Sequence, residues 1–177
     1  MFSRQLLGRT GASAALVAVV MFFLATSLFA HYFLGYSAVD DGADGREIRW
    51  LDYTQYDDAR QWAIDQWHAE GKVAILPQSA GHIVDLEWRD YSDCEPDAYL
   101  GYYQYYRFGI DKIYLNTCKL NSKTAAQKRA VAVHEQGHAL GLAHNPNDDQ
   151  IMYEYPASTG HTTPQSHDLE DYHALWP

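Results

Sequence analysis

The chain has 177 residues and a formal net charge of −10, from 13 Lys and Arg against 23 Asp and Glu. This length predicts one compact domain rather than two full-sized ones. Hydrophobic residues make up 47% and aromatic residues 14%, which excludes a disordered composition. The acidity excludes a nucleic-acid partner, because binding to phosphate backbones requires a basic surface.

The N-terminal segment has a short basic head followed by a long apolar run. Arg4 and Arg9 are the only charged residues before position 40. Residues 11–30 are apolar and long enough to cross a bilayer, which takes about 20 residues. The pattern is typical of an export signal, either an uncleaved signal-anchor or a cleaved signal peptide, with a buried core helix as the third reading.

We therefore assign residues 1–39 to a signal-anchor or signal peptide. The basic head predicts that the N-terminus stays inside and that the rest of the chain lies outside. If the segment is not cleaved, the protein is bound to the cell membrane through residues 11–30 as a single-pass protein. If it is cleaved, the protein is secreted. Both alternatives place the folded part in an extracytoplasmic compartment.

The sequence contains two cysteines, Cys94 and Cys118. In an exported protein we expect them to form a disulfide bond; the alternative is two unrelated buried thiols. Closing a loop of this length would stabilise the fold by ~3 kcal/mol in the chain-entropy description. The spacing excludes a CxxC redox or zinc pair.

After a polar linker at residues 40–46, residues 47–177 alternate between strand and helix patterns. A helix is expected at 123–140, with Ser122 as its N-cap and Gly141 as its stop, and a last helix at 166–176. The expected strands are 48–53, 72–76, 82–88, 99–107 and 111–117, the last two forming a hairpin, and another helix is expected at 57–70. This order predicts an α+β fold with one mixed sheet.

One motif carries metal chemistry, and it lies at the end of the 123–140 helix. His134 and His138 are four residues apart, so both imidazoles face the same side and can reach one ion. Gly141 permits a positive φ, which lets the chain leave the helix sharply and return His144 as a third ligand. Three neutral His ligands leave one open position on a tetrahedral Zn²⁺, which is typical of a catalytic site. Glu135 can reach water at that position.

The short motif H-E-x-x-H alone is not specific for a zinc site, because it recurs in unrelated proteins as charged residues on a helix surface. Gly141 and His144 at fixed offsets remove most such matches. The other six histidines are interpreted as ordinary polar residues. Among them, His161 and His167 are the candidates for an additional metal or substrate contact.

The stretch from His134 to His144 follows H-E-x-x-H-x-x-G-x-x-H, and the chain here resembles the metzincin zinc peptidases. Met152, eight residues past His144, is the Met-turn candidate. The motif, this loop length and the terminal helix from Ser166 to Trp176 are most similar to small bacterial matrixin-like domains. The resemblance is specific over residues 130–176, weaker over 45–120, and absent from 1–40.

The resemblance implies a metzincin-like zincin fold, with a twisted mixed sheet, an active-site helix and a C-terminal helix. It also implies a zinc-dependent endopeptidase with one catalytic Zn²⁺ and a protein or peptide substrate, which we expect to act as a monomer. Zn²⁺ would polarise the scissile carbonyl and activate water, with Glu135 as general base. Met152 would pack beneath the imidazoles. The sequence lacks a Cys-bearing prodomain segment, and Glu154 replaces the Tyr that astacin- and serralysin-like relatives carry after the Met.

Substrate contacts are expected from the hairpin edge and from the segment after Met152. An extended peptide could add as a strand to the hairpin, where Tyr103 and Tyr105 either line subsites or simply pack the edge strand. Tyr153 and Tyr155 belong to the segment expected to shape the pocket for the side chain after the scissile bond.

Two other functions remain open at this level. One is a membrane-anchored zinc-binding ectodomain that cleaves nothing, although Glu135 would then have no purpose. The other is a zinc hydrolase that acts on non-protein amides.

Overall fold

A computed structural model describes residues 31–42 and 45–177. The apolar segment at 11–30 lies outside these residues. Within the described part of the chain, no helix has the length and apolar character needed to cross a membrane.

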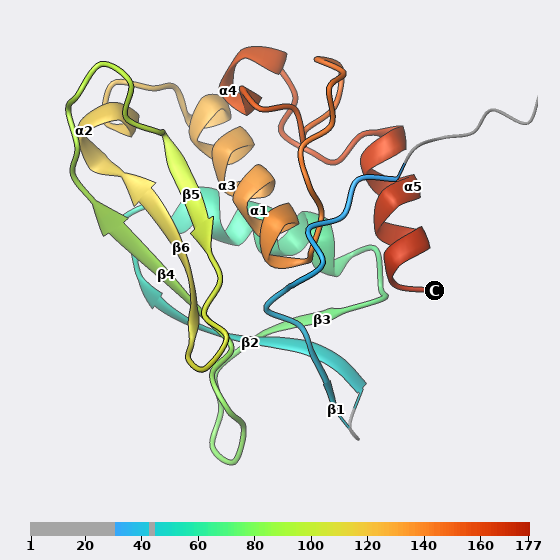
Figure 1. Ribbon diagram of the computed structural model, residues 1–177. Coiled ribbons are helices and arrows are strands. Elements are labelled where there is room, and N and C mark those ends of the chain that lie inside the picture. The colour runs from blue at the N-terminus through green and yellow to red at the C-terminus, as the bar shows by residue number, and fades with distance from the viewer. Residues whose placement is uncertain (1–30, 43–44) are drawn as a thin grey trace, which may run out of the picture.

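The described strands form one six-stranded sheet, with helices packed against it (Figure 1). The strands are β1 (Asp40–Gly42), β2 (Gly45–Tyr53), β3 (Ala74–Pro77), β4 (Leu86–Tyr91), β5 (Gly101–Gln104) and β6 (Asp111–Asn116). The helices are α1 (Asp57–His68), α2 (Thr117–Leu120), α3 (Ala125–Ala139), α4 (Pro156–Thr159) and α5 (Ser166–Leu175). The predicted α+β class with a mixed sheet is confirmed.

The sheet has the order β1-β2-β4-β6-β5, and β3 also pairs with β2. β2 runs parallel to β3 and β4, and β4 runs parallel to β6, whereas β1 and β5 are antiparallel to their neighbours. The predicted hairpin is present, with Tyr103 opposite Ile113. β5 is therefore an edge strand, and it lies beside α3.

Helices α1 and α3 cross on one face of the sheet and enclose the core (Figure 1). Trp67 of α1 and Trp88 of β4 are fully buried. The Trp67 indole N–H donates to the Val133 carbonyl of α3 (2.9 Å), and the Trp67 ring packs on Tyr172 of α5, with ring centroids 5.5 Å apart. These contacts fix α3, which carries the histidine motif, against α1, and α1 in turn against α5.

Several predicted boundaries differ from the structure, and one short helix was not predicted. The N-cap of α3 is Thr124, not Ser122, because the Thr124 hydroxyl accepts from the Gln127 amide and the Gln127 side chain accepts in return from the Thr124 amide. The strand predicted at 82–88 begins at Leu86 as β4. The short helix α2 directly follows β6, where the Asn116 side chain caps it.

The polar stretch at 40–46, expected to be a linker, contributes to the sheet. Asp40 pairs with Glu47 and Gly42 pairs with Gly45, so β1 and β2 form an antiparallel pair at one end of the sheet. Polar composition favoured a linker in the sequence analysis, but an exposed terminal strand can be polar on both faces because it packs against no core.

Residues 31–39, which we call the strap, run along the segment that follows α3. The Leu34 amide donates to the Gly141 carbonyl (2.8 Å), and the Ala143 amide donates to the Tyr32 carbonyl (2.8 Å). The Ala38 amide donates to the Ala139 carbonyl (2.8 Å). The strap thus supplies backbone partners to the turn at the C-terminal end of α3.

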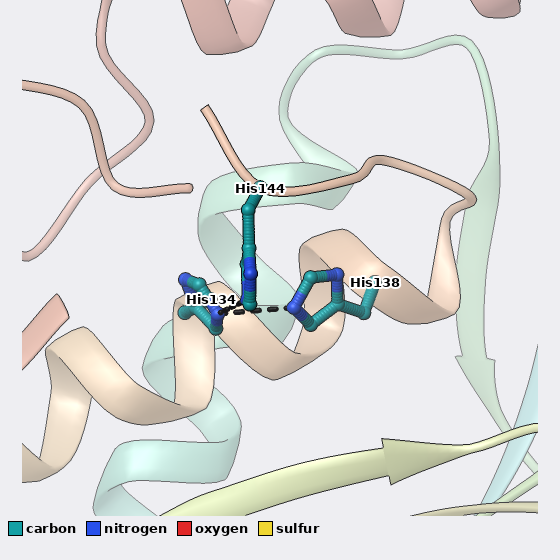
Figure 2. A group of neighbouring side chains, drawn as sticks. All are labelled: His134, His138 and His144. Atoms are coloured by element: carbon teal, nitrogen blue, oxygen red, sulfur yellow. Dashed lines mark hydrogen bonds between the residues drawn. The ribbon is translucent and has the colours of Figure 1, made fainter. Parts of the chain in front are cut away.

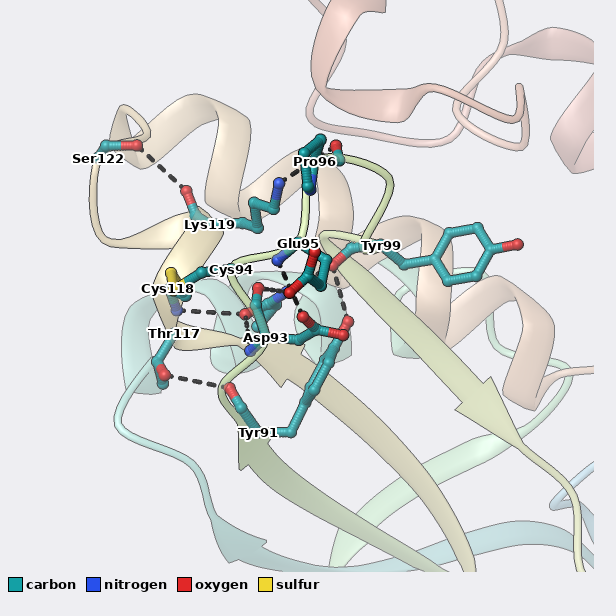
Figure 3. The surroundings of a disulfide bond; sticks show 11 residues. Tyr91, Asp93, Cys94, Glu95, Pro96, Tyr99, Thr117, Cys118, Lys119 and Ser122 are labelled. Carbon is teal, nitrogen blue, oxygen red and sulfur yellow. Dashed lines mark hydrogen bonds between the residues drawn. A yellow bond between two sulfur atoms is a disulfide. The ribbon is translucent and has the colours of Figure 1, made fainter.

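The predicted disulfide between Cys94 and Cys118 is present, with a Cα–Cα distance of 5.4 Å (Figure 3). It joins the loop after β4 to α2. Asn116, which is fully buried, also holds this loop: its side chain donates to the Asp93 and Tyr99 carbonyls (2.8 and 2.9 Å) and accepts from the Asp93 amide (3.1 Å). The loop enters β5 in a fixed position.

Candidate metal centre

The three histidines of the motif converge at one point beside the C-terminal half of α3 (Figure 2). Nε2 of His134 lies 3.0 Å from Nε2 of His138 and 3.2 Å from Nε2 of His144. One ring nitrogen from each residue lies within 4.8 Å of the others, so the group could hold a metal ion. Within the described residues, no other cluster of His, Cys, Asp and Glu meets this condition, and His161 and His167 are not part of it.

The turn that returns His144 depends on a glycine. Gly141 has a φ of +94°, as the sequence predicts. A Cβ at this position would lie 3.0 Å from Leu175 and 3.3 Å from the Tyr36 carbonyl of the strap. A side chain there would be strained and crowded, because the strap and α5 both pack directly against the turn.

Hydrogen bonds made by the His134 and His138 rings determine which ring nitrogen can bind a metal ion. Nδ1 of His134 donates to the Ile151 carbonyl, and Nδ1 of His138 donates to the Leu142 carbonyl, both at 2.8 Å. In neutral imidazoles this leaves Nε2 with a lone pair, so two lone pairs face each other at 3.0 Å. A cation between them removes this repulsion, and imidazole nitrogen suits Zn²⁺. The residues therefore fit a zinc ion.

Burial keeps the three imidazoles neutral, as metal ligands must be. Burial, together with neighbouring His138, lowers the pKa of His134 well below its usual range. Burial lowers the pKa of His138 to about 4. Burial also lowers the pKa of His144, while the charge of Glu154 acts in the opposite direction.

Glu135 is buried beside the histidines, and its Oε2 atom has no hydrogen-bond partner. Burial raises the pKa of Glu135 to about 8. Gly101 of β5 makes this close packing possible, because a Cβ there would lie 3.0 Å from Val131 and 3.2 Å from Cγ of Glu135. The backbone hydrogen bond from Tyr103 lowers the pKa of Glu135 but does not outweigh burial. A buried carboxylate oxygen without a partner is costly, and a nearby cation would offset that cost.

Met152 lies directly beneath the histidine helix. It is almost fully buried, and a Cβ on Gly137 would lie 2.4 Å from its Sδ atom. The Met152 and Ile151 amides both donate to the carboxylate of Asp168 (3.1 and 2.9 Å). Since Ile151 also accepts from His134, Asp168 positions the backbone that orients one of the three imidazoles.

The role of Asp168 and the close approaches to Gly101 and Gly137 were not predicted from the sequence. Asp168 has a local signal, because its side chain accepts from the Gln165 amide (2.7 Å) in a capping box at the start of α5. Its longer contacts join residues 16 and 17 positions apart and follow only from the fold.

A cleft of about 870 Å³ opens over the histidines and Glu135. Residues 96–103 form one wall, α3 forms the base, and residues 154–158 form the other wall. Tyr103 and Tyr155 line this cleft, whereas Tyr105 and Tyr153 do not belong to its lining. Tyr105 instead stacks on Tyr36 of the strap, with ring centroids 4.8 Å apart, and the Tyr103 hydroxyl donates to Asp111.

Comparisons with known proteins support both the fold and the zinc-binding motif. A solved structure titled "GM1 bound form of the ECX AB5 holotoxin" is similar over 73% of this chain and 79% of that chain, with a TM-score of 0.51 and 15% sequence identity. This likeness concerns the fold alone.

No match was found among curated proteins. The family model described as Matrixin, of the M10 peptidases, matches residues 47–176, which include every element from β3 to α5 and the three histidines. The chain therefore belongs to the matrixin family, and its domain is that of a zinc metallopeptidase.

Proposed function

We propose that this protein is a zinc-dependent endopeptidase, with His134, His138 and His144 as the ligands of one catalytic zinc ion. One observation carries the proposal: three neutral imidazoles and the buried carboxyl group of Glu135, whose Oε2 atom has no hydrogen-bond partner, meet at the base of an open cleft. A binding-only zinc site has no use for a buried acid beside its ligands. The burial of Glu135 costs stability and therefore favours a catalytic role.

Zn²⁺ at the three imidazoles would polarise the scissile carbonyl and lower the pKa of a water molecule. Glu135 would act as general base and then as general acid, taking a proton from water in the cleft and donating it to the leaving amine. His134 and His138 hold their orientation through their Nδ1–H donors to Ile151 and Leu142. The edge of β5 offers backbone groups along which an extended peptide adds as a strand.

The same proposal includes a peptide or protein substrate and an extracytoplasmic location. The Cys94–Cys118 disulfide supports the location, because such bonds are typical of oxidising compartments. The basic head and apolar run at residues 1–30 support it as well.

Replacement of the proposed base tests the mechanism. We expect Glu135→Ala to keep one zinc ion per chain and to lose about 10³-fold in the cleavage rate of denatured casein, because the general base is lost while the ligands stay in place. Zinc content is measured by atomic absorption and cleavage by release of peptides. Glu170→Ala, at an exposed position on α5, is the matched control and should cleave normally.

Two results would contradict the proposal. If Glu135→Ala cleaves as fast as the wild type, Glu135 is not the base. If the wild type holds one zinc ion per chain yet cleaves no member of a broad peptide library, the protein is not an endopeptidase. A non-catalytic zinc-binding ectodomain or a hydrolase of non-protein amides would then explain the site.

A further inference from the structure

The inference concerns which substrates the cleft selects, and it rests on the proposed endopeptidase function. One face of α3 and its N-terminal flank runs along the whole base of the cleft. Glu135, Val131 and Gln127 are spaced four residues apart on α3, which places them on one side of the helix, and all three line the cleft. Lys123, which also lines the cleft, comes just before Thr124, the N-cap of α3. From Glu135 to Ala125, the first residue of α3, the helix rises by ~15 Å, and Lys123 lies beyond that end.

We place the substrate residues after the scissile bond in this part of the cleft. Residues 154–158 form the facing wall, and they follow the Met-turn that is expected to shape the pocket after the scissile bond. An extended peptide advances ~3.4 Å per residue, so about five residues span this length. The Lys123 side chain has a flexible stem of about 6 Å, so its ammonium group can reach from the far end of the cleft towards Glu135.

Gln127 closes the wall between α3 and α4 and is not available to bind substrate freely. Its side-chain oxygen accepts from the Thr124 amide (3.1 Å), and its side-chain nitrogen donates to the Ala157 carbonyl (3.5 Å). Both ends of the amide are therefore occupied. Val131 is apolar and buried. Apart from Glu135, the proposed base, Lys123 is therefore the group of these four with unused hydrogen-bonding capacity.

Among residues 31–42 and 45–177, Lys123 is the only Lys or Arg that lines the cleft. It is half-buried, and among the described residues no carboxylate forms an ion pair with it. Asp97 and Glu154 also line the cleft but are exposed. An attraction at a half-buried cation is screened less by water and salt than a repulsion from exposed carboxylates. The positive end of the α3 dipole acts in the same direction as Lys123.

We propose that Lys123 is a specificity-determining residue that selects substrates with a Glu or Asp within the first three residues after the scissile bond. The carboxylate of the substrate would pair with the Lys123 ammonium at the far end of the cleft, while the scissile bond lies over Glu135.

The test uses quenched fluorescent peptides built from one cleaved parent sequence. Glu is placed at each of the first three positions after the scissile bond, and each peptide is compared with its Gln counterpart. A further peptide carries the same Glu three residues before the scissile bond. It has the same net charge, so it separates the local effect of Lys123 from the repulsion by the acidic protein as a whole.

We expect kcat/KM for the best Glu peptide to exceed that of its Gln counterpart by about fivefold at low salt, which is typical of a partly exposed ion pair. The ratio should fall towards one in ~0.5 M salt. In Lys123→Met the ratio should be about one, and in Lys123→Glu it should be inverted. Lys128→Met is the matched control and should keep the ratio, because Lys128 is on α3 but packs over the Tyr56 ring outside the cleft.

A second readout does not require turnover. Peptide binding to Glu135→Ala, measured by fluorescence anisotropy, should show the same preference for Glu, and the added Lys123→Met change should remove it. The inference is overturned if the wild type cleaves Glu and Gln peptides equally at all three positions, or if Lys123→Met keeps the preference. Such results leave the endopeptidase proposal intact, since that proposal fails only when no peptide is cleaved.

Discussion

The two sides of the cleft are built in different ways. The sheet side, residues 91–118, consists of the loop after β4, β5, β6 and α2, and is held by strand pairing, the disulfide and buried Asn116. The Met-turn side, residues 141–168, is largely irregular and is held by single long-range contacts from the strap, Gln150 and Asp168. On the sheet side several contacts hold the same segment, so the loss of one is compensated by the others. On the Met-turn side each contact holds its segment alone.

The difference matters because the two sides do different tasks. The sheet side presents the edge strand but contributes no ligand to the histidine cluster. The Met-turn side carries His144 and the Ile151 carbonyl that orients His134. Removing a support should therefore lower stability alone on the sheet side, and lower both stability and zinc affinity on the Met-turn side.

The largest expected effect follows removal of the disulfide. We expect the double variant Cys94→Ser, Cys118→Ser to lose ~3 kcal/mol of unfolding free energy, because the unfolded chain regains the freedom of a loop closed over 24 positions. Zinc affinity should stay within about twofold, since Asn116 and the β5–β6 pairing still hold the loop. Urea unfolding and zinc titration measure the two quantities. A large loss of zinc affinity would break the proposed separation between the two sides.

Asp168→Asn tests the other side. One carboxylate oxygen accepts from Ile151 and Gln165 and the other accepts from Met152, so in either orientation an Asn amide group would face a backbone N–H donor. We expect a loss of about 2 kcal/mol in unfolding free energy, and a weaker zinc affinity by about tenfold as His134 loses its fixed partner.

The matched control for Asp168→Asn is Asp148→Asn, which changes the same charge at an exposed position in the loop of the Met-turn side. It should leave zinc affinity unchanged. If Asp168→Asn lowers stability but binds zinc as tightly as the wild type, the Met-turn backbone does not control the imidazole.

The contrast between the two sides also explains which features could be predicted from the sequence. Periodicity, turn residues and the histidine spacing are local, so they predicted the sheet hairpin, α3, α5 and the histidine cluster. The positive φ of Gly141 was also predictable, because only a sharp turn returns His144. These features depend on residues a few positions apart.

Features that depend on distant partners were not predictable. Asp168 binds backbone 16 and 17 residues away, and Gly101 is required only because β5 approaches Glu135 across the fold. The strap looked like an extension of the apolar segment, since its pairing with Gly141 cannot be read from its own residues. Exposed β1 has the polar composition of a linker, so its pairing with β2 could not be predicted from its own residues either.

The smallest expected effect is a gain of stability on the sheet, at a carboxyl group with weaker support than Asp168. Burial raises the pKa of both groups, but Asp168 accepts from three backbone amides whereas Asp85 accepts from that of Arg49. Asp85, just before β4, accepts from the Arg49 amide (2.7 Å), yet burial raises its pKa to about 6, above that of an unfolded chain at about 3.9. The folded state therefore prefers the protonated form. Its relative stabilisation is complete below pH ~4 and is lost as pH rises through about 6.

At neutral pH the charged form of Asp85 thus costs stability, and Asp85→Asn removes that cost while keeping an acceptor for Arg49. We expect a gain of about 1 kcal/mol in unfolding free energy at pH 7.5, after allowing for partial solvent exposure, and a much smaller gain at pH 4.5. Urea unfolding of wild type and variant at each pH measures the difference, so any loss of zinc affects both alike. A loss of stability at pH 7.5 would mean that the ionised carboxylate supports the β2–β4 junction, and the two sides of the molecule would then depend on buried carboxylates in the same way.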